Sequence, residues 1–170
     1  MIAEIGHFAL ILALVLSVVQ CVLPLVGAAR GIGSWMALAR TAAYANALFL
    51  TISFGTLAYS FYISDFTLLN VASNSNSLLP WFYKVAASWG SHEGSILFWA
   101  LMLTWWGFLV ALTSRKLPQE TVARVLGVMG FITAGFVAFM LFTSNPFLRL
   151  FPAAPEGKNY IIGTNISQDN

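Results

Sequence analysis

The hydrophobic residues of this chain gather into four long tracts that contain no charged side chain. The tracts hold 22, 24, 21 and 24 residues and lie between His7 and Arg30, Arg40 and Asp65, Glu93 and Arg115, and Arg124 and Arg149. A helix needs about 20 predominantly apolar residues to cross the hydrocarbon layer of a membrane. The pattern therefore predicts four transmembrane helices, over about residues 5–28, 41–63, 94–113 and 122–143.

The tracts are predicted to be helical because lipid offers the backbone no hydrogen-bonding partner, whereas a helix satisfies its own N–H and C=O groups. The period-2 alternation of a transmembrane β-barrel is absent from the sequence. Composition agrees, since 59% of the 170 residues are hydrophobic and only 8% are charged, far below the share in soluble domains. We predict an all-α, polytopic integral membrane protein.

The first tract is predicted to stay in the protein as a helix rather than to be a cleaved signal peptide. Its amino end carries Glu4 and His7 where a signal peptide carries Lys or Arg, and its apolar run exceeds a signal core. The single cysteine, Cys21, lies inside this tract and has no partner for an internal disulfide. We expect it to pack as a small apolar residue.

Lys and Arg in short loops predict the orientation, because these residues stay on the cytoplasmic side. Two short connections, between the first and second and between the third and fourth tracts, hold most of these cations: Arg30, Arg40, Arg115, Lys116 and Arg124. The other side receives Lys84 in a long loop, and Arg149 and Lys158 in the tail. Both termini and the long loop are therefore predicted to face away from the cytoplasm.

The long loop, from about Asp65 to Glu93, divides into two halves of different character. Its first half is dense in Asn and Ser (Asn70, Ser73, Asn74, Ser75 and Asn76), which favour turns through hydrogen bonds from side chain to backbone. The second half, Leu78 to Trp89, spaces Trp81, Phe82, Val85 and Trp89 so that they share one helical face. We expect a short helix there, lying on the membrane surface.

The main candidate motif is Trp89-Gly90-Ser91-His92-Glu93-Gly94-Ser95, at the start of the third tract. In a structural interpretation, Ser91 caps the helix, Glu93 complements the positive end of its dipole and Gly94 allows close packing. In a functional interpretation, His92 supplies a pH-sensitive or metal-binding group. The neighbouring tryptophans would then shape a pocket at the membrane edge for a flat aromatic ligand.

Other polar and aromatic residues favour structural roles. Glu4 and His7 lie one helical turn apart, and a solvated ion pair is expected. The aromatic residues of the third tract, among them Trp99, Trp105 and Trp106, are expected to make packing and lipid contacts. The sequence contains no metal-ligand cluster, phosphate-binding loop or catalytic triad motif.

Several short strings, in order, resemble the amino-terminal region of the CcmF family of cytochrome c haem lyases, over residues 1 to about 158. The strings are Glu4-Ile5-Gly6, Asp65-Phe66-Thr67, residues 71–76, 85–95 and 122–126, and Phe142-Thr143-Ser144-Asn145-Pro146-Phe147. The centre, Val85-Ala86-Ala87-Ser88-Trp89-Gly90-Ser91-His92-Glu93-Gly94-Ser95, resembles the family most closely. Together the strings are specific, although each alone is not.

The resemblance implies a multi-pass protein of the bacterial inner membrane that takes part in cytochrome c maturation. The family attaches haem to apocytochrome c on the periplasmic side, together with a haem chaperone and thiol-reducing assembly partners. The candidate haem-side residues here are Trp89, His92 and Glu93, with Asn74 and Asn76 as candidate partner contacts. No catalytic residue or metal ligand is assigned, because the family's tryptophan-rich haem motif and histidine ligands lie beyond the matched strings.

The chain departs from the family pattern after Lys158, and we treat residues 159–170 as a divergent tail. A truncated or frameshifted product and a naturally split subunit all fit this departure. Without the family's axial histidines, the chain is not expected to bind haem tightly on its own. An alternative function is a non-catalytic membrane subunit that organises an assembly complex through Gly127, Gly130 and Gly135. A transporter fragment ranks lower, because no charge lies at a tract centre.

Overall fold

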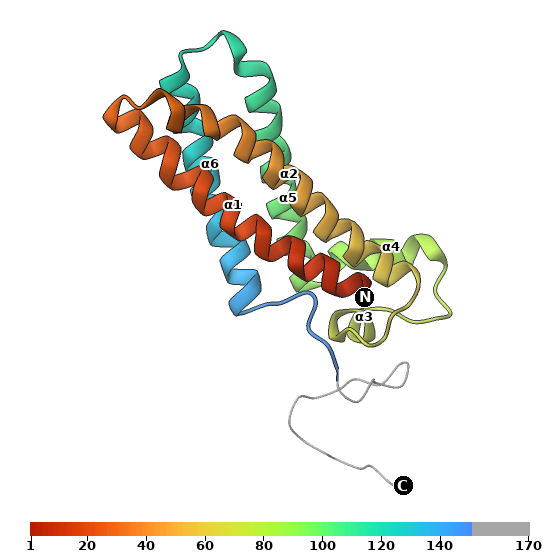
Figure 1. Ribbon diagram of the computed structural model, residues 1–170. Helices are drawn as coiled ribbons and strands as arrows, with labels where there is room; N and C mark the ends of the chain where they lie inside the picture. Colours follow the sequence, from red (N-terminus) through yellow and green to blue (C-terminus); the bar gives the residue numbers. More distant parts are fainter. Residues whose placement is uncertain (151–170) are drawn as a thin grey trace, which may run out of the picture.

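The computed structural model describes residues 1–150 as a bundle of four long helices with a cap of two short ones (Figure 1). The long helices are α1 (Ile2–Arg30), α2 (Gly33–Tyr62), α5 (His92–Thr113) and α6 (Gln119–Phe142). The short ones are α3 (Leu69–Asn74) and α4 (Trp81–Gly90), and a 3₁₀ turn, Ser114–Lys116, follows α5. All four long helices are long and apolar enough to cross a membrane. The predicted all-α membrane fold is confirmed.

The helices are longer than the uncharged tracts, and this changes where some charged residues lie. Only Gly31 and Ile32 separate α1 from α2, so Arg40 belongs to the second turn of α2 rather than to a loop. The prediction that Arg40 lies in the connection was wrong. A charged side chain does not end a helix, and α2 already begins at Gly33. Arg40 instead donates from its guanidinium to the backbone oxygen of Ser114, 3.0 Å away, and so ties α2 to the end of α5.

Small residues allow α1 and α6 to pack closely. A Cβ on Gly130 would lie 3.0 Å from the backbone nitrogen of Cys21, and a Cβ on Gly127 would lie 2.7 Å from the Leu25 side chain. Nothing lies within 4 Å of the corresponding position on Gly135. Gly127 and Gly130, two of the three glycines proposed to contact a helix of a partner protein, therefore contact α1 of the same chain.

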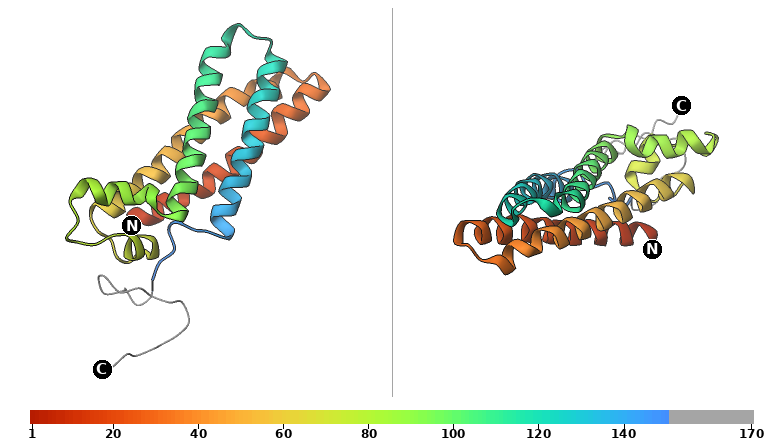
Figure 2. Two further views of the ribbon diagram at one scale, coloured as in Figure 1. Left: turned by 180° about the vertical axis from the view of Figure 1, so that it is seen from behind. Right: turned by 90° about the horizontal axis from the view of Figure 1, so that it is seen from above.

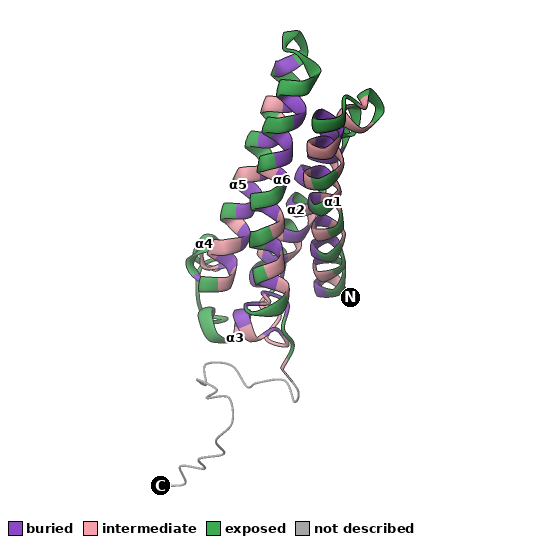
Figure 3. Ribbon diagram, turned by 90° about the vertical axis from the view of Figure 1, so that its left-hand side faces the viewer, coloured by how far each residue is buried: buried purple, intermediate pink, exposed green. Residues whose placement is uncertain are grey.

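Each long helix buries one stripe and exposes the rest (Figure 3). About a third of the most apolar stretch of α1, α5 and α6 is buried, and the exposed remainder is still apolar. Phe8, Trp99, Trp106 and Phe131 are each at least 60% exposed. In water such a surface would be unstable, whereas in a bilayer it contacts lipid tails.

The connections of the bundle segregate to its two ends (Figures 1 and 2). The amino terminus, α3, α4 and the segment after α6 lie together at one end, which we call the N-terminal end. The α1–α2 and α5–α6 connections lie together at the opposite end. The five cations used to predict orientation thus lie in or close to one end of the bundle.

Two short helices, α3 and α4, form the cap at the N-terminal end. The sequence had predicted a turn-rich loop followed by a single helix. The expectation of turns was wrong over Leu69–Asn74, which is helical as α3. Asn74 Nδ2 donates to the backbone oxygen of Asn70, 2.9 Å away, and this is an ordinary bond within one helical turn. The side chains of Ser73 and Asn74 both bond to backbone oxygens one turn earlier, so these polar residues are accommodated in a short helix. α4 begins three residues later than the predicted Leu78.

The segment after α6 turns near residues 145–148 and then closes the cap. The backbone N–H of Leu69 donates to the oxygen of Leu148 at 2.9 Å, and that of Leu150 donates to the oxygen of Thr67 at 2.8 Å. These two bonds form an isolated antiparallel bridge between Leu68 and Arg149. The segment 143–150 is thereby held across the N-terminal end, beside α3 and the start of α5.

Candidate functional site at the N-terminal end of the bundle

The candidate motif forms a sharp corner between α4 and α5. Ser91 is the N-cap of α5, and its Oγ accepts a hydrogen bond from the backbone N–H of Gly94 at 3.1 Å. A Cβ on Gly94 would lie 1.7 Å from the backbone oxygen of Ser88, so only glycine fits here. The structural interpretation of Ser91 and Gly94 is confirmed. The corner fixes the directions in which the residues between them point.

Trp89 and His92 lie on the outside of this corner. The Trp89 ring packs against Phe98 of α5, with centroids 6.2 Å apart, and the residue is 45% exposed. The imidazole of His92 is exposed, and its Nδ1 lies 3.3 Å from the Oγ of Ser144. One ring nitrogen of His92 therefore contacts the segment after α6, and the other has no hydrogen-bond partner among residues 1–150.

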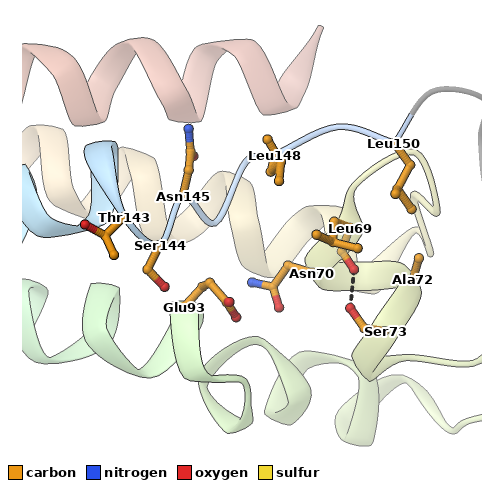
Figure 4. Close-up of a pocket in the computed structure, with 10 residues that line it drawn as sticks. All are labelled: Leu69, Asn70, Ala72, Ser73, Glu93, Thr143, Ser144, Asn145, Leu148 and Leu150. Carbon is orange, nitrogen blue, oxygen red and sulfur yellow. Dashed lines mark hydrogen bonds between the residues drawn. The ribbon is translucent and has the colours of Figure 1, made fainter. Parts of the chain in front are cut away.

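Glu93 points in another direction, into a pocket between α3, α5 and the segment after α6 (Figure 4). The pocket has a volume of about 290 Å³ and is lined by Leu69, Asn70, Ala72, Ser73, Glu93, Thr143, Ser144, Asn145, Leu148 and Leu150. The carboxylate of Glu93 forms no ion pair or hydrogen bond with the described residues 1–150. The structure thus separates Glu93 from Trp89 and His92, which do not line this pocket.

The two candidate partner contacts, Asn74 and Asn76, use their amides locally. The Nδ2 of Asn74 donates to Asn70, both to its backbone oxygen and, at 3.1 Å, to its Oδ1. The Oδ1 of Asn76 accepts from the backbone N–H of Leu78 at 3.0 Å and closes the turn before α4. Neither side chain lines the pocket.

The first helix does not contain the ion pair expected from its sequence. Glu4 pairs with the terminal ammonium group at 2.6 Å and with the guanidinium of Arg149, whereas His7 Nδ1 lies 3.4 Å from the Nδ2 of Asn145. The Glu4–His7 prediction was wrong because the chain returns after α6 and brings Arg149 and Asn145 to these positions. Both histidines of the chain consequently contact the adjacent residues Ser144 and Asn145.

A buried polar contact in the middle of the bundle was not predicted from the sequence. Gln20 of α1 and Asn46 of α2 are 3% and 1% exposed, and their side-chain amides lie 2.7 Å apart. The Nε2 of Gln20 also donates to the backbone oxygen of Leu126 in α6 at 2.9 Å. The sequence could have predicted this contact, because carboxamide side chains are unusual inside apolar tracts and favour hydrogen bonds to neighbouring helices in lipid.

The described residues do not enclose a site of the size and ligand set of haem. His92 is at the surface, and the pocket beside Glu93 contains no histidine. A second cavity, of about 440 Å³, is lined by His7 together with Glu4, Phe8 and Arg149, but His92 is not part of it. Among residues 1–150, no group of three or more His, Cys, Asp or Glu side chains is placed to hold a metal ion.

The chain is similar to known proteins of cytochrome c biogenesis. No protein-family model matches the chain. Over 159 residues the chain is 55% identical to the cytochrome c-type biogenesis protein CcmF of Pseudomonas aeruginosa. The matched residues make up 94% of this chain and 24% of that relative. The chain corresponds to the amino-terminal region of CcmF proteins. It is also 46% identical to CcmF of Escherichia coli over 160 residues, with 25% of that protein covered.

A solved structure supports the same assignment. The structure named cytochrome c haem lyase CcmF superimposes with a TM-score of 0.82 at 28% identity, over 86% of this chain and 25% of the CcmF chain. The resemblance predicted from the sequence is therefore confirmed. The chain spans about a quarter of the length of the CcmF relatives that it matches.

Proposed function

We propose that this chain is the amino-terminal membrane portion of a haem lyase that attaches haem to apocytochrome c. The observation that carries the proposal is the 55% identity to a CcmF protein over 94% of the chain. The shared fold with the solved haem lyase supports it. The chain supplies four scaffold helices and a cap, and haem ligation and catalysis fall to the remaining three quarters of a CcmF-length protein.

The N-terminal end of the bundle is proposed to face the periplasm across the inner membrane. The five cations close to the opposite end support this orientation through the positive-inside rule. The exposed aromatic residues of α4, which include Trp81, Phe82 and Trp89, are then proposed to lie at the outer headgroup layer. In this orientation the α4–α5 corner is available to haem, a haem chaperone and apocytochrome c with its thiol-reducing partners.

Cysteine labelling in whole cells tests the orientation. In a Cys21→Ser background, Asn76→Cys should react with a membrane-impermeant maleimide, because Asn76 is exposed in the cap. Leu117→Cys, which is also exposed but lies at the opposite end, should react only after the membrane is permeabilised. The reverse pattern would place the cap in the cytoplasm and remove the basis for a periplasmic haem-handling role.

His92 is the proposed haem-side residue that can be tested most directly. We expect His92→Ala, made in a CcmF-length protein that carries this sequence as its amino-terminal part, to lower the yield of haem-stained cytochrome c at unchanged protein level. His7→Ala is the matched control, because His7 lies at the same end and contacts Asn145, next to the Ser144 that His92 contacts. Full activity in His92→Gln, which can keep the contact with Ser144, would assign His92 a structural role only.

A further inference from the structure

We propose that Trp99 and Trp106, which we call the tryptophan seam of α5, pack against a transmembrane helix from the remaining three quarters of a CcmF-length protein. This helix carries hydrogen-bond acceptors for both indole N–H groups. The inference rests on the proposed function only in taking this chain as the amino-terminal portion of such a protein.

The two tryptophans of the seam share the side of α5 that faces away from the bundle. They are seven residues apart, which is close to two helical turns, so one lies above the other along the helix. Trp99 is 69% exposed and Trp106 is 62% exposed, whereas the buried residues of α5 lie on its other side. In this chain on its own, both rings therefore face lipid.

Both tryptophans lie within the hydrocarbon layer when α5 crosses a membrane. The helix has 22 residues, so it is about 33 Å long against about 30 Å of hydrocarbon. Trp99 and Trp106 each lie about 10 Å from the nearer end of the helix. Helical side chains lean toward the N-terminus, so the Trp106 ring leans toward the middle of the membrane. It therefore lies away from the headgroup layers in which tryptophan is usually found.

The indole N–H groups of the seam have no acceptor within the bundle. Neither Nε1 forms a hydrogen bond with residues 1–150, whereas Nε1 of the neighbouring Trp105 donates to Thr51 Oγ1 at 3.2 Å. An indole nitrogen can only donate, and lipid tails accept no hydrogen bond. Because an unpaired polar group is unfavourable in hydrocarbon, the two N–H groups require acceptors from outside the bundle.

The length of the CcmF relatives identifies the partner. The matched region is 24% of the Pseudomonas aeruginosa CcmF and 25% of the solved CcmF chain, so most of a CcmF-length protein remains to pack beside this bundle. A second copy of this chain, joined symmetrically through the same face, would place indole donors against indole donors. A helix with Ser, Thr, Asn or Gln oxygens about two turns apart satisfies both indoles instead.

A groove between α5 and α6 lies beside the seam and supplies a packing surface. It has a volume of about 390 Å³, and all of its lining residues are apolar: Ile96, Ile132, Gly135, Phe136 and Phe139. Ile96 lies one helical turn before Trp99 on α5, so the groove and the seam are neighbours. A Cβ on Gly135 would have no atom within 4 Å. Side chains of a packed helix can therefore fill this groove while its polar atoms reach the indoles.

Site-specific photocrosslinking tests which molecule covers the seam. In the hybrid protein used here, the matched residues of this chain replace their counterpart in the Pseudomonas aeruginosa CcmF. The photoreactive residue p-benzoylphenylalanine is placed at position 99 or 106, and native membranes are irradiated. We expect crosslinked peptides that join each position to a segment beyond the matched region. Adducts with lipid alone, or crosslinks only between two copies of the protein, would overturn the proposal.

Trp106→Phe provides a second measurement, because it keeps an aromatic ring and removes the N–H group. We expect it to lower the apparent Tm of the hybrid protein and to leave that of this chain alone unchanged. One lost hydrogen bond between membrane helices corresponds to about a threefold smaller folding equilibrium constant. Trp105→Phe is the matched control, because its bond to Thr51 lies within the chain, and it should lower both Tm values. An equal effect of Trp106→Phe on the two proteins would contradict the inference.

Cytochrome c maturation by the hybrid protein separates this inference from the proposed function. Normal maturation together with lipid adducts alone would remove the inference and leave the proposed function standing. Crosslinks to the remaining part without any maturation would support the inference and count against the proposed role in haem attachment.

Discussion

The buried contact between Gln20 and Asn46 offers the sharpest test of how this bundle is held together. Gln20 bridges α1 to α2 through Asn46 and to α6 through the backbone oxygen of Leu126. Hydrogen bonds between membrane helices average about 0.6 kcal/mol each and reach about 1.7 kcal/mol. Gln20→Met keeps the length of the side chain and removes both bonds. We therefore expect it to lower the free energy of unfolding by about 1–3 kcal/mol.

The double variant separates the hydrogen bond from the packing. Asn46→Leu alone leaves the Gln20 amide without one of its partners, whereas Gln20→Met with Asn46→Leu leaves no unpaired amide. The double variant should therefore be more stable than the sum of the single effects predicts, by about 1 kcal/mol. The unfolding free energy can be measured by steric trapping in bicelles.

The matched control for this experiment is Gln119→Met. Gln119 donates to the backbone oxygen of Gly33 at 3.1 Å, but it is exposed at the opposite end of the bundle. An exposed bond competes with water, so the expected loss is below about 0.5 kcal/mol. Additive effects of Gln20→Met and Asn46→Leu, within about 0.3 kcal/mol, would refute the argument that the two amides interact.

Two pairs of glycine variants test the close approaches, again by the free energy of unfolding. Gly94→Ala should destabilise the chain by about 3 kcal/mol or more, because its methyl group would overlap the backbone oxygen of Ser88. Gly90→Ala, with nothing within 4 Å, should change stability by less than about 1 kcal/mol. Gly130→Ala should cost about 1–2 kcal/mol through its contact with α1. Gly135→Ala, with open space around it, should instead stabilise by about 0.5–1 kcal/mol, and equal losses in both would contradict the proposed packing.

The candidate site was only partly predictable from the sequence. The cap at Ser91 and the need for glycine at position 94 follow from local rules, because their partners lie within a few residues. The pocket of Glu93 did not follow from them, since its walls come from three segments that are far apart in the chain. The pairing of Glu4 with Arg149 has the same origin.

The sequence by itself determined that the chain has four membrane-spanning helices, because the hydrophobic tracts need lipid and lipid requires helices. It also determined the resemblance to CcmF, because ordered strings are a property of the chain and not of its shape. Only the tertiary structure decided which face of each helix is buried, which polar groups meet and where the segment after α6 returns. In lipid all apolar faces are equally favourable, so close packing and hydrogen bonds between distant residues make that choice.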